Sequence, residues 1–268
     1  MRRIAHISDL HFGRHSDAIA EDLLTSIGDH KPDVIAFSGD FTQRARTSEF
    51  VQARVFLDRI AQPKLLVPGN HDVPLYNLFS RFLRPFTKYD LHFGSAGQPS
   101  NFYADDEIAM LGVNTARSFT RTNGRVSVAQ MQQIASVLGA LPRDVFKILV
   151  THHPLASPEG TPALELAGRA VAAVTAAKKA GVHLFLSGHH HRAVSGGNAE
   201  LEAGGSVLVL HAGTAISTRT RGSDGNSYNL LEIAADHVSV RLMEHVGSAF
   251  RETRISQYSF DGKKWGAP

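Results

Sequence analysis

Five short apolar segments, each followed at once by Asp, His or Asn, constrain the fold of this chain more than any other feature. The clearest occupies residues 65–72, where three aliphatic residues lead through Pro68 and Gly69 into Asn70-His71-Asp72. An apolar run closed by Pro-Gly is typical of a buried strand that ends in a sharp turn. Polar residues at such a strand end occupy the place where open α/β sheets bind their ligands.

The other four segments repeat this design. Residues 4–8 lead into Asp9-Leu10-His11, 34–37 into Ser38-Gly39-Asp40, 148–150 into Thr151-His152-His153-Pro154, and 184–186 into Ser187-Gly188-His189-His190-His191. If the five strands lie side by side, these polar groups converge on one patch. Carboxylates and imidazoles with one amide are the ligands that borderline or hard divalent metals prefer. The sequence therefore predicts a metal site.

Composition narrows the class of protein. The 268 residues include no cysteine, which excludes disulfides, thiolate zinc sites and iron–sulfur clusters and fits a reducing compartment. The chain passes from Met1-Arg2-Arg3 straight into an apolar strand, and no run approaches the roughly 18 apolar residues that span a membrane. We therefore expect a soluble, cytoplasmic protein without a membrane span.

Charge points to a small anionic partner. The formal net charge is only +3, and arginines gather in three places along the chain: Arg44 and Arg46; Arg117, Arg121 and Arg125; and Arg219 and Arg221. Such scattered groups suit a small anionic substrate better than a nucleic acid polymer, which needs a long basic track. Each single arginine can equally well be a solvated surface residue.

The first third of the chain reads as β-α-β-α-β. Strands are expected at 3–8, 33–38 and 64–67, and amphipathic helices at 16–30 and 47–61. Ser16 or Asp17 is expected to cap the first helix, and Thr47 or Ser48 the second. This order implies parallel strands joined by helical crossovers.

The middle of the chain offers a candidate cap. Residues 74–97 are aromatic and irregular, and they form either a helix that packs its apolar face or a cap over the site. An antiparallel pair at 101–104 and 108–114 follows, and the Arg-bearing loop 115–126 is a candidate to line the site. Ser127 is expected to cap a helix that reaches about residue 141, before a strand at 145–151.

An Ala-rich helix is expected at 162–180, ended by Gly181 and followed by a strand at 182–187. Short alternating segments then follow at 192–195, 206–211, 227–233, 237–244 and 254–260, and they predict a second, largely antiparallel sheet. We therefore predict a single domain over residues 1–268. Its fold class is α/β, a four-layer α-β-β-α sandwich of two packed mixed sheets with helices on the outer faces.

Five motifs occur in order along the chain: Asp9-x-His11, Gly39-Asp40, Gly69-Asn70-His71-Asp72, His152-x-Pro154 and Gly188-His189-x-His191. Together they resemble the signature blocks of the calcineurin-like metallophosphoesterase superfamily. Within it, the chain looks most like bacterial class III cyclic-nucleotide phosphodiesterases and glycerophosphodiesterases. One such motif alone is uninformative, but five in order are specific. One position departs from the common pattern, because Phe41 stands where Leu is usual.

The resemblance implies an enzyme that hydrolyses phosphoesters. It also implies that the enzyme uses two metal ions, which share one protein ligand. Two dications about 3.5–4 Å apart bind phosphate oxygens, and a hydroxide bridging them attacks phosphorus in line. A carboxylate can bridge two ions, and the resemblance makes Asp40 that bridge. The remaining ligands are Asp9, His11 and His191 for the first ion and Asn70, His152 and His189 for the second. Nitrogen and oxygen donors without thiolate permit Mn, Fe, Zn or Co.

His71 is the family's histidine that does not bind metal and acts near the leaving group or a phosphate oxygen. Its alternative role is to hold Asn70 in place. Asp72 is expected to orient His71 or the turn. On an extended segment, residues 189 and 191 point to the same side, so His190 is not expected to be a ligand.

Four further histidines adjoin a motif or lie in apolar runs, and none of them belongs to the expected ligand set. His153 is off the matched position, and His6 and His183 lie inside apolar runs, where histidines with satisfied hydrogen bonds are expected. His211 ends another apolar run and is a candidate for a supporting role.

The expected function is hydrolysis of a phosphodiester in a small anionic substrate, of the cyclic-nucleotide or glycerophosphodiester type. A phosphomonoesterase or a nucleotide-lipid pyrophosphohydrolase with the same metal centre is the alternative, and a non-catalytic binding scaffold is a remote one. The sequence leaves the substrate, the metal and the oligomeric state open.

Overall fold

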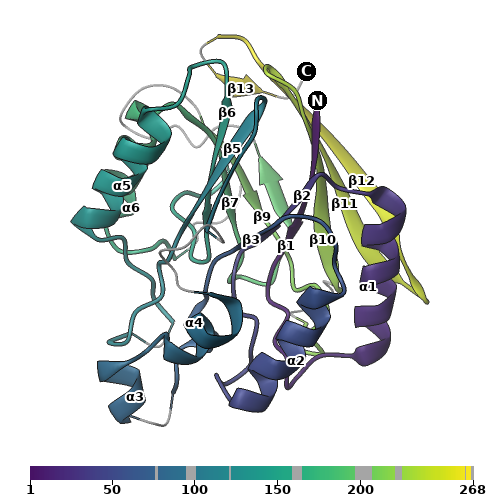
Figure 1. Cartoon of the computed structure of the whole chain (residues 1–268). Coiled ribbons are helices and arrows are strands. Elements are labelled where there is room, and N and C mark those ends of the chain that lie inside the picture. The colour runs from purple at the N-terminus through teal and green to yellow at the C-terminus, as the bar shows by residue number, and fades with distance from the viewer. Residues whose placement is uncertain are drawn as a thin grey trace.

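The computed structural model describes residues 1–75, 78–94, 101–120, 122–158, 165–196, 207–220, 225–262 and 264–266, and within them two β-sheets lie face to face (Figure 1). The first sheet has the order β13-β12-β11-β10-β1-β2-β3 and the second has the order β4-β5-β6-β7-β9-β8. The strands of the first sheet are β1 (Arg2–Ile7), β2 (Val34–Phe37), β3 (Lys64–Leu66), β10 (Ser227–Ile233), β11 (His237–Val246), β12 (Ala249–Phe260) and β13 (Trp265–Gly266). Those of the second are β4 (Phe102–Ala104), β5 (Ile108–Val113), β6 (Phe146–Thr151), β7 (Val182–Ser187), β8 (Val194–Gly196) and β9 (Leu208–His211).

Both sheets are mixed. Strands β1, β2 and β3 pair in parallel, as the β-α-β-α-β pattern predicts, and β5, β6, β7 and β9 also run parallel to one another. Antiparallel strands extend each sheet, because β10 pairs with β1, β4 with β5, and β8 with β9. The described helices are α1 (Asp17–His30), α2 (Thr47–Asp58), α3 (Leu78–Leu83), α4 (Thr87–Phe93), α5 (Val128–Gly139) and α6 (Ala170–Lys179).

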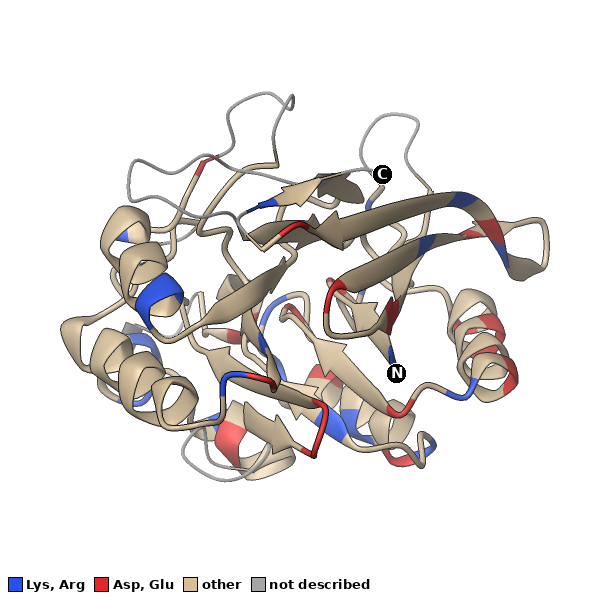
Figure 2. Ribbon diagram, turned by 90° about the horizontal axis from the view of Figure 1, so that it is seen from above, with Lys and Arg blue, Asp and Glu red and all other residues tan. Residues whose placement is uncertain are grey.

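Three buried apolar clusters fill the spaces between four layers. Ile4 lies between the two sheets, whereas Ile7, three residues further along the same strand, packs with Leu23 of α1 on the outer face. Ile134 of α5 and Val174 of α6 cover the second sheet. From above, α5 and α6 lie on the left, the sheets in the middle and α1 on the right (Figure 2). The predicted four-layer sandwich is confirmed.

Side-chain caps fix two helix starts as predicted. The Ser16 hydroxyl accepts a hydrogen bond from the Ile19 N–H at 3.4 Å, so α1 begins directly after Ser16. Ser127 and Gln130 form a reciprocal box, in which the Gln130 N–H donates to Ser127 Oγ and the Ser127 N–H donates to Gln130 Oε1. Such caps satisfy amide groups that have no partner inside the helix.

The predicted cap of α2 is wrong. Neither Thr47 nor Ser48 caps this helix, because it begins at Thr47 and its flanking residue is Arg46. The buried carboxylate of Glu49 accepts the N–H groups of Arg44 and Arg46 at 2.8 and 3.1 Å instead. A negative charge in the first turn also suits the helix dipole, which explains this use of Glu49.

The Ala-rich helix begins later than predicted. Residues 159–164 lie outside the described part, and residues 165–169 are not helical. The N–H of Gly168 donates to the Gly124 carbonyl at 2.8 Å, and Arg169 adopts a left-handed φ of 65°, so the backbone enters α6 only at Ala170. The helix ends as predicted, with Gly181 at a φ of 80° directly after the cap residue.

The strands after residue 191 do not form a sheet of their own, contrary to the prediction. β8 and β9 join the second sheet, whereas β10, β11 and β12 extend the first sheet from β1. Alternating apolar residues predict strands but do not identify the sheet edge that each strand joins. The last long strand, β12, is also longer than the predicted 254–260, because it forms a hairpin with β11 through Gly247.

Both ends of the described chain contribute to the core between the sheets. This core contains Ile4 from β1 and Trp265 from β13, and both side chains are fully buried. The shared core supports a single domain over residues 1–268, which stays a prediction. Among the described residues, no helix has the length and apolarity that crossing a membrane requires, and the cytoplasmic location also stays a prediction.

Candidate metal centre

The segments that follow β1, β2, β3, β6 and β7 meet at one end of the sheets (Figure 1). Backbone hydrogen bonds join them: the Asp9 N–H donates to the Gly39 carbonyl at 3.0 Å, and the Gly188 N–H donates to the His152 carbonyl at 3.1 Å. The polar groups therefore converge as predicted. They come from two facing sheets, however, rather than from five strands in one row.

Asp9, His11 and His191 form one group of candidate ligands. Nε2 of His191 lies 3.2 Å from Oδ1 of Asp9 and 3.1 Å from Nε2 of His11. Nε2 of His11 lies 3.5 Å from Oδ1 of Asp9, and all three side chains are buried. Donor atoms of the three residues lie within 4.8 Å of one another, so this group can hold a metal ion.

Asn70, His152 and His189 lie in the adjoining part of the site. Oδ1 of Asn70 lies 3.1 Å from Nε2 of His152, and the rings of His152 and His189 have centroids 5.1 Å apart. His152 also belongs to a group with Asp9 and Asp40 that can hold a metal ion.

Asp40 lies between these two groups. Its Oδ2 atom is 3.8 Å from Nε2 of His11 and 3.4 Å from Nε2 of His152. Its other oxygen, Oδ1, accepts the backbone N–H of His71 at 2.8 Å. One carboxylate therefore faces histidines of both groups, which is the arrangement that a bridging ligand requires.

Backbone strain marks the same residues. Eight described residues other than glycine have a positive φ, and five of them are candidate ligands: Asp9, His11, Asp40, His189 and His191. Left-handed conformations cost roughly 1–3 kcal/mol each for such residues and persist where the surrounding structure enforces them. These strained conformations lower the stability of the fold, and they orient the side chains of the candidate ligands.

Glycines give the ligand segments the space they need. A Cβ at Gly69 would lie 2.1 Å from Oδ1 of Asp40, and one at Gly188 would lie 1.9 Å from Oγ of Ser8. At Gly39, whose φ is 103°, a Cβ would lie 2.5 Å from Nδ1 of His152. The glycines of three sequence motifs thus permit the close approach of the ligands.

Hydrogen bonds orient the imidazoles. Nδ1 of His152 lies 2.7 Å from the Ser38 carbonyl, and Nδ1 of His191 lies 3.2 Å from the Arg219 carbonyl. A carbonyl can only accept, so each Nδ1 carries the proton and each Nε2 faces the centre. Such partners fix the tautomer of metal-binding histidines.

The charges in the site favour bound cations. Burial raises the pKa of Asp9 and of Asp40, but the surrounding imidazoles outweigh burial and hold the pKa of both carboxyl groups far below the usual range. Burial lowers the pKa of His152, yet the charge and hydrogen bond of Asp40 raise it to about 9, and Asp9 raises the pKa of His191 in the same way. The carboxylates thus attract protons that metal ions would displace. The nitrogen and oxygen donors fit divalent ions.

His71 lies beside this centre with one nitrogen already engaged. Nδ1 of His71 lies 2.7 Å from the backbone oxygen of Gln43 and 3.2 Å from Nε2 of the Gln43 side chain. Its ring meets that of His11 edge-on at a centroid distance of 4.9 Å. Donation from Nδ1 to the carbonyl leaves Nε2 available to a substrate.

Asp72 orients the turn, as predicted. Its buried carboxylate accepts the N–H groups of Gly69, Phe41 and Thr42, and it also accepts the Thr42 hydroxyl. These bonds tie the segment after β3 to the segment after β2. Phe41 itself is fully buried in the apolar cluster under α1 and α2, so its exchange for the usual Leu touches no ligand.

His153 lies nearer to the site than predicted. It forms a group with His152 and His189, and its ring centroid is 4.6 Å from that of His189. Its Nδ1 atom lies 2.8 Å from the Thr115 hydroxyl, and the ring packs on Gly124. A His-His-Pro segment does not reveal this placement, because it depends on the loop at 115–126.

His190 belongs to none of the groups of candidate ligands among the described residues. The reason differs from the predicted one, because β7 ends at Ser187 and His189 and His191 have positive φ rather than extended backbone.

The histidines that lie in apolar runs of the sequence, His6, His183 and His211, each have a hydrogen-bond partner. His6 is fully buried and lies 3.0 Å from the Ser38 hydroxyl, and His183 accepts the Lys147 N–H, as predicted. His211 lies 2.7 Å from the Ser187 hydroxyl and joins none of the described ligand groups.

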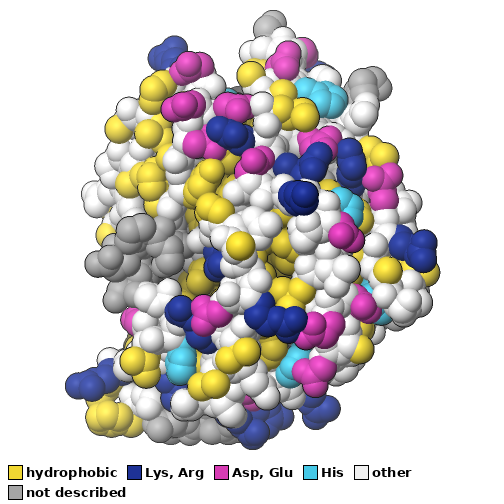
Figure 3. All heavy atoms as spheres, turned by 45° about the vertical axis from the view of Figure 1, so that its right-hand side comes forward, with side chains coloured by type: hydrophobic (Ala, Val, Ile, Leu, Met, Phe, Trp, Pro, Cys, Tyr) yellow, Lys and Arg dark blue, Asp and Glu magenta, His cyan; other side chains and the backbone are white. Residues whose placement is uncertain are grey.

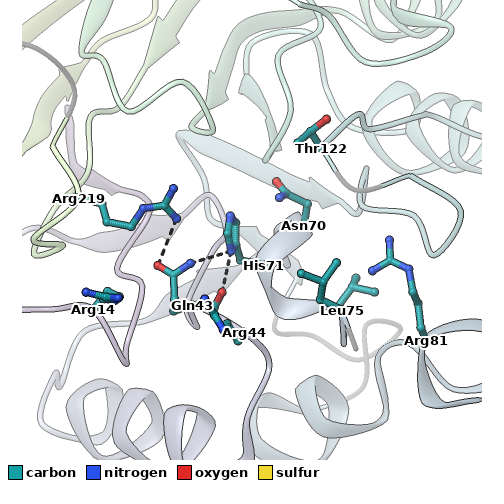
Figure 4. A pocket seen from close by; sticks show the side chains of 10 residues that line it. Arg14, Gln43, Arg44, Asn70, His71, Leu75, Arg81, Thr122 and Arg219 are labelled. Atoms are coloured by element: carbon teal, nitrogen blue, oxygen red, sulfur yellow. Dashed lines mark hydrogen bonds between the residues drawn. The ribbon is translucent and has the colours of Figure 1, made fainter. Parts of the chain in front are cut away.

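A pocket of about 540 Å³ opens over the centre (Figure 4). Its walls come from the segments after β1, β2 and β3, from the predicted cap region and from two loops; they are Arg14, Gln43, Arg44, Asn70, His71, Val73, Leu75, Arg81, Thr122 and Arg219. Leu75, Arg81 and Thr122 of the range 74–126 line this pocket. Asn70 and His71 belong to a sequence motif, and Arg44 and Arg219 belong to the arginine groups seen in the sequence. Sequence reasoning missed the roles of Arg14, Gln43 and Val73, which have no distinctive motif.

The region 74–97 also packs on the core, as the helix interpretation predicts, whereas a cap over the site stays a prediction. Tyr89 and Phe93 of α4 are buried against Phe41, whereas Phe79 and Phe82 of α3 are exposed. Residues 76–77 and 95–100 lie outside the described part, as does Arg121 of the loop at 115–126. In that loop, Arg117 bonds Gln130 and serves the scaffold instead of lining the pocket.

Known proteins share this fold. The chain resembles the solved structure of a dimetal phosphatase from Danio rerio, with a TM-score of 0.64 and 13% identity over 94% of this chain and 99% of that one. It also resembles purple acid phosphatase PPD1 from yellow lupin (Lupinus luteus) seeds, with a TM-score of 0.62 and 13% identity over 96% of this chain and 53% of that one. At such identities the likeness shows the fold alone.

A curated relative is the glycerophosphodiester phosphodiesterase GpdQ of Enterobacter lignolyticus (strain SCF1). It is 28% identical over 165 residues, which cover 56% of this chain and 56% of that protein. The match thus spans little more than half the length of the relative.

The sequence profile described as calcineurin-like phosphoesterase matches residues 2–193, which include all five motifs. This match covers well over half of the chain, and it confirms the resemblance seen in the motifs. The chain therefore belongs to the calcineurin-like phosphoesterase family.

Proposed function

We propose that this chain hydrolyses phosphodiester bonds in a small anionic substrate with two metal ions. The observation that carries the proposal is the position of Asp40, whose carboxylate faces His11 on one side and His152 on the other. In this proposal, Asp9, His11, Asp40 and His191 hold one ion, and Asp40, Asn70, His152 and His189 hold the second.

Each residue then has a defined task. Bound dications supply Lewis-acid activation of the phosphate and of a water molecule. Asn70 contributes a neutral oxygen, which limits negative charge where the anionic substrate arrives. His71, held at Nδ1 by Gln43, directs Nε2 at the substrate, where it donates a proton to the leaving oxygen or bonds a phosphate oxygen.

Diesters are favoured over monoesters. The relative at 28% identity is named a glycerophosphodiester phosphodiesterase, and His71 can assist the departure of an alkoxide, which is a poor leaving group. The alternative is hydrolysis of a phosphomonoester or of a nucleotide-lipid pyrophosphate at the same centre. The solved structures with this fold include proteins named as phosphatases, so a monoester substrate is tested as well.

A hydrolysis screen of metal-loaded protein tests this function. It compares cyclic nucleotides, glycerophosphodiesters, aryl monoesters and diesters, and nucleotide pyrophosphates, with metal content measured on the same sample. We expect a higher kcat/KM for diesters than for monoesters. A higher value for aryl monoester than for aryl diester would assign the protein to the phosphatases. No turnover of any compound by fully loaded protein would favour a binding scaffold.

A further inference from the structure

The pocket over the metal centre has two unlike sides. In Figure 4, one group of side chains lies to one side of His71 and another group lies to the other side. The first consists of Arg14, Gln43 and Arg219, and the second of Leu75, Arg81 and Thr122. The first side carries two guanidinium groups, Arg44 and Arg81 add two more to the lining, and none of the described lining residues is an acid.

Arg81 serves the scaffold. Its side chain is buried, and its guanidinium donates to the carbonyl oxygens of Pro74 at 3.1 Å and Thr120 at 2.7 Å. These bonds fix the wall formed by the segment after β3 and the loop at 115–126. The second side of the pocket therefore presents mainly Leu75, Val73 and the Thr122 side chain to a substrate.

Arg14 is in a different situation. It is exposed at the pocket mouth, and its described hydrogen bonds involve its backbone. The Arg14 N–H donates to the His11 carbonyl at 2.8 Å, and the Arg14 carbonyl accepts the N–H and hydroxyl of Thr218 at 2.8 and 2.9 Å. It forms no ion pair with any carboxylate in the described part of the chain. The backbone of Arg14 is thus anchored, while its guanidinium stays available.

Arg219 is anchored in a similar way. Its backbone oxygen accepts from Nδ1 of His191, and its guanidinium donates to Oε1 of Gln43 at 3.3 Å (Figure 4). A neutral amide uses one of its five N–H donors and does not neutralise its charge. No described carboxylate pairs with Arg219 either. Two positive groups on backbone segments bonded to each other therefore share one side of the pocket.

Building on the proposed function, we propose that Arg14 and Arg219 bind a second anionic group of the substrate. The substrate class is a phosphodiester with one arm that ends in a carboxylate or phosphate. The diester lies at the metal centre, and the terminal anion meets the two guanidinium groups, whose planar donors match the oxygens of carboxylate and phosphate. A diester with two neutral arms lacks this contact.

Two symmetric probes test the proposal, because each presents the same arm whichever way it binds. Bis(2-carboxyethyl) phosphate carries an anion on both arms, and bis(3-hydroxypropyl) phosphate has neutral arms of similar length. Inhibition of bis(4-nitrophenyl) phosphate hydrolysis in initial-rate assays measures the affinity of each probe for protein of verified metal content, because the probes are themselves diesters that the protein can hydrolyse. We expect the carboxylate probe to bind about tenfold more tightly, as hydrogen bonds between charged groups warrant.

Three variants test whether the preference for the carboxylate probe depends on Arg14 and Arg219. Arg14→Gln should abolish most of the preference for the carboxylate probe and leave the affinity for the neutral probe unchanged. Arg219→Gln should do the same and also lower kcat, because it releases Gln43 beside His71. Arg143→Gln removes the same charge just before β6, at the opposite end of that strand from the site, and should keep the preference.

Two results would overturn the proposal while leaving the phosphodiesterase function intact. One is equal affinity for the two probes in protein that hydrolyses the nitrophenyl diester. The other is an equal loss of affinity for both probes in Arg14→Gln, which would place Arg14 on the diester phosphate itself. Absence of diester hydrolysis in metal-loaded protein would overturn the proposed function as well.

Discussion

At the scale of single residues, the candidate ligands are positioned by contacts that leave no room for added atoms. A Cβ at Gly69 would meet Oδ1 of Asp40 at 2.1 Å and the Asp40 backbone nitrogen at 2.5 Å. Rotation of the Asp40 side chain relieves the first contact but not the second. The segments after β2 and β3 would therefore have to separate, and the distance between Asp40 and Asn70 would change.

We therefore predict that Gly69→Ala loses metal affinity and activity together, by at least about tenfold, since even ligand-supporting contacts contribute 10–100-fold. Metal titration checks this. Gly28→Ala is the control, because Gly28 lies in α1 with nothing within 4 Å of its missing Cβ. That change should raise stability by about 0.5–1 kcal/mol. Full metal affinity in Gly69→Ala would refute the role of the close approach.

His71 offers a second test at this scale. His71→Ala should keep its metal content, because no ligand role is proposed for it, and should lower kcat about 10²–10⁴-fold with a smaller change in KM. The deficit should shrink on a nitrophenyl ester if His71 protonates the leaving group, since nitrophenolate departs without a proton. Metal loss in this variant would instead assign His71 to holding Asn70.

The sequence indicates which polar groups converge on the candidate metal centre, but it indicates less about the pocket wall. Asp9 and Asp40 each lie within three residues of the end of a strand, in a short motif that is visible in the sequence. Arg14 and Arg219 lie in irregular segments that meet only through tertiary bonds, such as the one from Thr218 to Arg14. Their convergence depends on which sheet edge the C-terminal strands join, and local pattern does not encode that.

At the scale of elements, β7 contains a half-buried histidine, His183, that faces β6 and couples stability to pH. Nδ1 of His183 accepts the Lys147 N–H at 3.0 Å, and its ring stacks on Phe146. Burial, with a smaller contribution from the charge of Lys147, lowers the pKa of His183 from 6.5 to about 4. The unfolded chain therefore binds a proton more readily than the folded one between these two values.

Folding stability should consequently fall as pH decreases from about 6.5 to about 4. This one group accounts for a loss of about 2 kcal/mol between pH 7 and 5. His183→Asn keeps an acceptor for the Lys147 N–H and removes the titration, so its unfolding free energy should fall less over that range. Parallel pH dependence of the two proteins in urea unfolding would show that His183 is not responsible.

The elements also show which boundaries a sequence can predict. Ser16 and Ser127 carry hydroxyls that cap helices by themselves, so both starts are predicted correctly. The start of α2 depends on a carboxylate three residues inside the helix, and that of α6 on the bond from Gly168 to Gly124. A boundary fixed by a distant partner is not visible in local sequence.

At the scale of the whole molecule, the two sheets share one core that the end of the chain completes. Trp265 is fully buried and contacts Phe146 of the other sheet, with ring centroids 5.8 Å apart. If residues 1–268 form a single cooperative unit, Trp265→Ala should lower the unfolding free energy by about 3–5 kcal/mol. Circular dichroism during denaturation measures this, and Trp265→Phe should lose less. A midpoint unchanged in Trp265→Ala would mean that β13 is not part of the unit.

Charge on the molecular surface accords with a small substrate. On the face shown in Figure 3, Lys and Arg side chains are interspersed with Asp and Glu, and Figure 2 shows the same mixture from above. A nucleic acid polymer binds to continuous basic tracks, and the face in Figure 3 shows no such track among the described residues.

Metal stoichiometry tests the central claim most directly. Protein reconstituted with excess divalent metal, freed of unbound ions and subjected to elemental analysis should contain about two ions per chain, as a bridged centre requires. Asp40→Asn should lower the content more than any other single ligand change, because Asp40 faces both groups, whereas Asp236→Asn in the exposed turn after β10 should leave it unchanged. A wild-type plateau at one ion or none, or a larger loss in His191→Ala than in Asp40→Asn, would contradict a centre bridged by Asp40.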